Sequence, residues 1–132
     1  MAGNPRGMAN AETGWSDPHE AMPMVADAQG MKWATAYMGG TKPDLDHDGW
    51  MYMLHGDMGE DNTMAGVMTK EEAAPGQWIE SGPHLMRMPA DPSSLDVMTT
   101  DFNSGSPYVM FAGTTYAHVM YPMQDYFIYT KE

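Results

Sequence analysis

The stretch that decides the fold is 77–88, QWIESGPHLMRM. The Ser-Gly pair at 81–82 divides it into two short strands, since these residues favour turns. In the second strand, HLMRM at 84–88, the histidine and both methionines share one face, because alternate residues of a strand point the same way. The same spacing returns in His118 and Met120. Two separate strands therefore carry a His-x-Met pair.

A helix is expected ahead of these strands. Asp27 can cap it, and the glycine pair at 39–40 ends it. The segment 50–55 then alternates as a strand, with Met51, Met53 and His55 on one face. Further strands are expected at 77–80, 83–88, 108–112, 115–121 and 126–129, with a turn at 113–114 and long loops at 56–76 and 89–107.

These elements predict an α+β fold, a small and mostly antiparallel sheet or sandwich of five to six short strands with one N-terminal helix. Residues 1–26 are rich in Gly, Asn, Pro and acids, and we expect an irregular N-terminal arm there. Residues 27–132 are expected to form a single domain, because a chain of this length fits one domain.

The apolar composition is unusual. Leu, Ile, Val and Phe together number only 14 of 132 residues, whereas methionine alone numbers 17. So few aliphatic residues with a high net charge would ordinarily favour disorder. The 17 Met, 4 Trp and 7 Tyr supply the missing apolar mass. We therefore expect a folded core built from thioether and aromatic groups.

The net charge of −12 excludes several classes of partner. Nucleic acid and anionic membrane surfaces would be repelled, and no basic patch offsets the charge. No apolar run is long enough to insert into a membrane. The chain has no cysteine, which excludes disulfides, zinc thiolate sites and cysteine nucleophiles. No serine-hydrolase, phosphate-loop or metalloprotease motif occurs, so we do not expect an enzyme.

The His-x-Met pairs predict a soft-metal site. Imidazole and thioether are donors that Cu(I) accepts and that Mg²⁺ or Ca²⁺ does not. If the strands are neighbours, His84, Met86, His118 and Met120 can form one cluster, with Met53 as a further ligand. The other interpretation is that methionine fills the core and the histidines are hydrogen-bonded core residues.

Two weaker patterns also bear on metal binding. Asp44, Asp46 and Asp48, followed by glycine, match the first half of an EF-hand loop and suggest calcium. However, the twelfth position of that loop is His55 instead of glutamate, so an acidic surface turn is the other interpretation. Methionines also occur in the 56–76 loop, where they can recruit copper or fold back as a lid over the core.

Parts of the chain are similar to a family of small exported bacterial proteins without assigned function. The strings WIESGPHLM at 78–86 and YAHVM at 116–120 carry this resemblance, supported by MKWATAYM at 31–38 and YML at 52–54. The likeness covers about residues 28 to 122. It implies a leader peptide removed before Met1, and therefore a periplasmic or secreted location, but it implies no activity.

A looser likeness concerns periplasmic copper chaperones with a cupredoxin-like fold. Their motif has a His or Met, ten residues, a Met, twenty-one residues and then His-x-Met. Here ten residues separate Met53 from Met64, and nineteen precede His84. The likeness supports the choice of donors.

The sequence therefore predicts a periplasmic or secreted copper-binding protein that sequesters or delivers the metal. The alternative is a structural or interaction protein with a methionine-rich core, which self-associates or wraps a protein partner.

Overall fold

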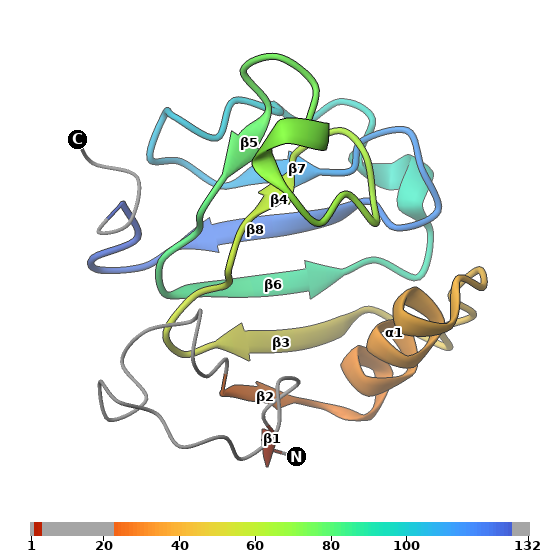
Figure 1. The fold of residues 1–132 in the computed structure, drawn as a ribbon. Coiled ribbons are helices and arrows are strands. Elements are labelled where there is room, and N and C mark those ends of the chain that lie inside the picture. The colour runs from red at the N-terminus through yellow and green to blue at the C-terminus, as the bar shows by residue number, and fades with distance from the viewer. Residues whose placement is uncertain (1, 4–22, 128–132) are drawn as a thin grey trace.

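The computed structural model of the protein describes residues 2–3 and 23–127. Its main sheet has six antiparallel strands in the order β1-β2-β3-β6-β8-β7, and β4 and β5 form a small second sheet (Figure 1). The elements are β1 (Ala2–Gly3), β2 (Met24–Ala26), α1 (Ala28–Gly39), β3 (Gly49–Met53), β4 (Glu60–Asp61), η1 (Lys70–Glu72), β5 (Trp78–Ile79), β6 (His84–Met88), η2 (Pro92–Leu95), β7 (Tyr108–Met110) and β8 (His118–Pro122). This architecture confirms the predicted α+β class.

The predicted helix is confirmed together with both of its ends. Asp27 is the N-cap, and its carboxylate accepts a 2.7 Å hydrogen bond from the backbone of Gly30. Gly40 ends the helix in the left-handed conformation. Gly30 itself is required by packing, because a Cβ there would lie 2.4 Å from the carbonyl oxygen of Trp50. The helix therefore approaches β3 at backbone contact distance.

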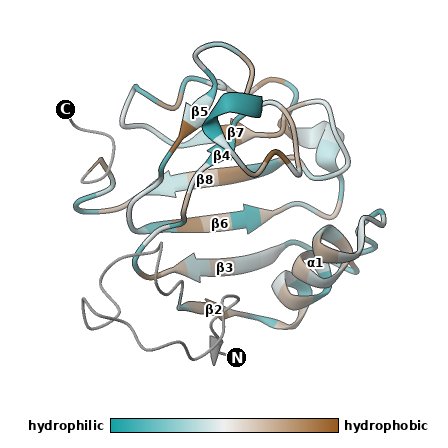
Figure 2. Ribbon diagram, in the orientation of Figure 1, coloured by the Kyte–Doolittle hydropathy of each residue, from teal (hydrophilic) through white to brown (hydrophobic). Residues whose placement is uncertain are grey.

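Alternation in the strands divides the main sheet into two faces. We call the face under α1 the inner face and the opposite one the outer face. On β3 the predicted alternation is confirmed, since Met51 and Met53 are buried while Trp50 and Tyr52 are exposed. The inner residues of β6 are buried in the same way. Methionine and aromatic side chains dominate this core, as composition predicted. In Figure 2, η1 is hydrophilic, whereas the central strands show a mixture of hydrophobic, neutral and hydrophilic positions.

The outer face is covered only in part by described residues. Leu95 of η2 packs with Val109, Ala117 and Val119 as a second small core behind β7 and β8. Phe111, which follows β7, has a positive φ of 56° and begins the connection to β8. β7 and β8 pair antiparallel, so the predicted hairpin is present.

Several predicted boundaries are wrong. The 56–76 loop contains β4 and η1, and β5 pairs with β4 instead of joining the main sheet. Tyr126 and Phe127 form a turn, closed by a bond from the Tyr126 amide to the Met123 carbonyl, and 128–129 lie outside the described residues. The arm predicted at 1–26 is not irregular at 2–3 and 24–26, because these residues pair as β1 and β2. Residues 4–22 lie outside the description.

Candidate functional site

The two His-x-Met pairs lie on adjacent strands and on the inner face. Met86 of β6 is the direct cross-strand partner of Met120 of β8. Met53 of β3 is opposite His84, and His118 is opposite Met110 of β7. All five predicted ligands are therefore inner-face residues, and all are buried. Met110, which sequence reasoning did not select, occupies the same layer.

The register separates the two histidines. His84 of β6 is opposite Pro122 of β8. When the same register is extended by one residue, His118 lies level with Met88, which is four residues after His84 on β6. Four residues of strand span about 13 Å. Two imidazoles on one metal ion need nitrogen atoms about 4 Å apart. The register therefore places one histidine near each end of the inner face, and a single cluster that contains both histidines stays a prediction.

Both histidines are fixed in the same tautomer. The Nδ1 atom of His84 lies 2.7 Å from the Gly82 carbonyl oxygen, and that of His118 lies 2.9 Å from the Tyr116 carbonyl oxygen. A carbonyl only accepts, so each Nδ1 carries the proton and donates it. In a neutral ring, Nε2 then presents a lone pair, which is the arrangement of metal-binding histidines.

Each Nε2 atom is buried and has no hydrogen-bond partner among the described residues. An unpaired polar atom in the interior costs about 1–3 kcal/mol. Burial lowers the pKa of both imidazoles to about 4, in His84 with a further contribution from the charge of His118. The rings are therefore neutral at pH 7, which is the state that binds a metal ion.

The surroundings of the two rings differ. The ring of His118 packs edge-to-face with Trp33 at 5.0 Å and with Phe111 at 5.5 Å between centroids. Tyr126 contacts the His84 ring at 6.1 Å. The Oδ2 atom of Asp57 lies 3.9 Å from the Nε2 atom of His84. Among the described residues, a carboxylate oxygen is therefore found within 4 Å of Nε2 at His84 but not at His118.

Asp57 is held in place by the chain on both sides of it. Its amide donates to the Ser81 carbonyl at 3.0 Å, and its Oδ1 accepts from the Gly59 amide at 3.3 Å. Gly56 precedes it with a φ of 88°, and a Cβ there would lie 2.0 Å from the Ser81 carbonyl oxygen. The loop after β3 is therefore pressed against the start of β6. Sequence reasoning missed Asp57, although the glycines around it were a signal of a fixed turn.

A second carboxylate lies in the same region. Burial raises the pKa of Asp57 to about 7, with a contribution from the charge of Glu80. Burial raises the pKa of Glu60 to about 8, and the charge of Asp57 acts in the same direction. The Tyr37 hydroxyl donates to Glu60 at 3.4 Å. Clusters of titratable groups with perturbed pKa values are typical of functional sites.

Buried hydroxyl groups line the other side of this region. The hydroxyl of Tyr126 bonds to the Ser81 hydroxyl at 3.2 Å and also to the Tyr108 hydroxyl. Burial raises the pKa of Tyr126 to about 12 and also raises that of Tyr108, so both are neutral at pH 7. These three hydroxyl groups are hydrogen-bonded to one another, and the Tyr126 ring packs against that of His84.

The predicted calcium loop does not converge on one point. Asp46 pairs with Lys32 at 2.9 Å, and Asp48 pairs with Arg87 at 3.0 Å, while Asp44 is exposed. The chain continues into β3, where an EF-hand would have its second helix. Within residues 2–3 and 23–127, no group of three or more His, Cys, Asp or Glu side chains is placed to hold a metal ion. A site in this part of the chain therefore needs other donors, and methionine is the abundant one.

Two methionines of the 56–76 loop do not cover the core. The side chains of Met64 and Met68 are 42% and 65% exposed, so the lid interpretation is wrong for both.

For the described part of the chain, no helix has the length and apolar character needed to cross a membrane. Comparisons with protein families, curated proteins and solved structures find no match to this chain.

Proposed function

We propose that the protein binds a copper ion between His84 and Asp57, with the inner-face methionines beside them as thioether ligands. The observation that carries the proposal is the 3.9 Å separation of His84 Nε2 and Asp57 Oδ2. The neutral imidazole presents a lone pair at Nε2, Asp57 in its ionised form presents one at Oδ2, and the separation is too long for a hydrogen bond. Metal bonds to nitrogen and oxygen are each about 2 Å long, so one ion bound to both atoms would span such a gap.

The neighbouring donors favour copper over other metals. Met53 is the cross-strand partner of His84, and such partners have Cβ atoms about 5 Å apart. Met86 follows His84 on the same face. A thioether and an imidazole suit Cu(I), while hard ions prefer oxygen alone. The carboxylate would also compensate the charge of the ion in a buried position.

The expected role is sequestration or delivery of the metal in a periplasmic or secreted location. The net charge of −12 favours attraction of cations to the protein surface. The side chain of Asp57 is 13% exposed, so the proposed site is in contact with solvent through this residue. His118, Met120 and Met110 form a second group of donors at the other end of the inner face. We expect weaker binding there because no carboxylate of residues 23–127 pairs with His118.

The test is a competition assay in which a colorimetric chelator and the protein share Cu(I) under anaerobic conditions. His84→Asn is the informative variant, because its side-chain NH₂ can still donate to the Gly82 carbonyl while Nε2 is lost. His47→Asn, at an exposed position, is the matched control. We expect about 100-fold weaker binding for H84N, about tenfold for Asp57→Asn, and no change for H47N.

Absence of Cu(I) binding by the unmodified chain, or equal affinity of H84N and the unmodified chain, would overturn the proposal. X-ray absorption of the copper-bound protein gives an independent check, since sulfur and nitrogen scatterers should both appear.

A further inference from the structure

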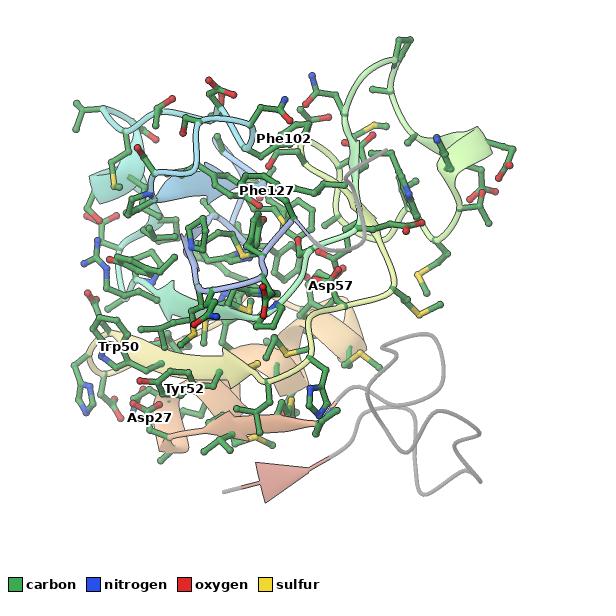
Figure 3. The ribbon with its side chains drawn as sticks, turned by 90° about the vertical axis from the view of Figure 1, so that its left-hand side faces the viewer. Asp27, Trp50, Tyr52, Asp57, Phe102 and Phe127 are labelled. Carbon is green, nitrogen blue, oxygen red and sulfur yellow. The ribbon has the colours of Figure 1, made fainter. Side chains whose placement is uncertain are left out.

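The outer face carries a second feature, unrelated to the metal site. Val25, Trp50, Tyr52 and Leu54 are between 37% and 46% exposed, and all four belong to β2, β3 or the residue directly after β3. Figure 3 shows Trp50 and Tyr52 together along β3, well away from Asp57. These four side chains form a contiguous apolar strip on an otherwise acidic chain.

Three aromatic rings form a platform across the strands. Tyr52 is opposite Leu85 of β6, which is opposite Tyr121 of β8, so the three residues form one row. Trp50 lies in the next row, and its ring is 6.2 Å from that of Tyr121 with a tilt of 35° between the planes. The rings of Trp50 and Tyr121 thus meet over β6, and Tyr52 lies on the same face of β3, two residues after Trp50.

A pair of charged groups borders the platform. Arg87 is the cross-strand partner of Trp50, and its Nη1 donates to Asp48 Oδ2 at 3.0 Å. Their side chains are 28% and 39% exposed, so both can contact a ligand. Together they offer guanidinium donors and a carboxylate acceptor with no net charge.

The size of the platform decides between kinds of ligand. Four strands from β2 to β8 span about 14 Å, and the five residues of β3 span about 16 Å, which gives roughly 220 Å². A stable protein–protein interface buries about 800 Å² on each partner. The platform is therefore too small for a stable dimer, but it matches the length of two or three sugar rings.

We propose that this face binds a neutral glycan chain. The C–H faces of pyranose rings would stack on Trp50, Tyr121 and Tyr52, and the Arg87–Asp48 pair would bond the hydroxyl groups at the edge. Such sites combine an apolar surface with a few placed polar groups. The glycan is neutral because a net charge of −12 repels acidic polysaccharides.

The experiment is calorimetric titration of the full chain with six-sugar probes, namely cellohexaose, xylohexaose, maltohexaose and N-acetylchitohexaose. Trp50→Ala and Tyr121→Ala are the test variants, with circular dichroism and thermal unfolding to confirm that they fold. Met38→Ala removes a side chain that is 77% exposed on α1 and serves as control. We expect at least one probe to bind, with about tenfold loss in W50A and Y121A and none in M38A.

Several outcomes would overturn the inference. One is failure of all four probes to bind the unmodified chain, and another is equal affinity of W50A and the unmodified chain. If light scattering at about 100 µM shows a dimer that the W50A substitution dissociates, the outer face binds a second copy of the chain. Stronger binding of a proline-rich peptide at the same residues would assign it to a peptide ligand. The copper assay is unaffected by any of these results.

Discussion

Replacement of the carboxyl groups of Asp57 and Glu60 should uncover a strong dependence of stability on pH. The folded chain holds two kinds of titrating group with opposite effects. Burial lowers the pKa of His84 and His118 to about 4, and it raises the pKa of Asp57 to about 7 and that of Glu60 to about 8. The double variant Asp57→Asn with Glu60→Gln removes only the second kind.

The sign follows from which state binds more protons. Between pH 5 and 6.5 the unfolded histidines are partly or fully protonated while the folded ones are neutral, so lowering the pH favours unfolding. The two carboxyl groups do the reverse, since they are protonated in the folded chain and ionised in the unfolded chain. The two protons that the unfolded chain binds at the histidines are nearly balanced by the two that the folded chain binds at the carboxyl groups. In the unmodified chain the free energy of unfolding should therefore vary little in this range.

The double variant loses this cancellation. Each proton contributes about 1.4 kcal/mol per pH unit, so two histidines give a slope approaching about 3 kcal/mol per unit as the pH falls below 6.5. Urea unfolding of the metal-free protein, followed by tryptophan fluorescence at half-unit steps from pH 5 to 8, measures it. Asp44→Asn with Asp101→Asn, at two exposed positions, is the control. Parallel pH profiles for the double variant and the unmodified chain would refute the reasoning.

Three further predictions concern stability. Gly30→Ala should lower the free energy of unfolding by about 2 kcal/mol, because the added Cβ would clash with the Trp50 carbonyl. Gly39 has open space around it, so Gly39→Ala should raise the free energy of unfolding by up to about 1 kcal/mol through helix propensity. Thermal unfolding of the two variants compares these effects. Asp61→Ala should cost on the order of 3 kcal/mol, since this buried carboxylate accepts bonds of 2.6 to 2.9 Å from Thr63, Met64 and Ala74, and urea unfolding that shows less than about 1 kcal/mol would contradict this. Tyr126→Phe should cost about 1–3 kcal/mol because it removes the hydroxyl that bonds to both Ser81 and Tyr108, and Tyr121→Phe on the outer face should be neutral in the same assay.

The sequence by itself determined the local structure. Asp27 and the glycine pair at 39–40 fixed both ends of α1, because capping depends on residues within one turn. Alternation fixed which residues of β3 and β6 face the core, because side chains alternate with a period of two. The excess of methionine correctly predicted a thioether core, since few other apolar residues were present.

Only the tertiary structure decided which of these residues meet. The register of β6 with β8 placed Met86 against Met120 and left His84 and His118 four residues apart in level, and no local pattern encodes such a register. The contact between Asp57 and His84 joins positions 27 residues apart through a loop folded onto Ser81, and it depends on chain packing. The candidate site therefore combines His84, Met53 and Met86, to which the sequence pointed, with Asp57, which only folding brought to them.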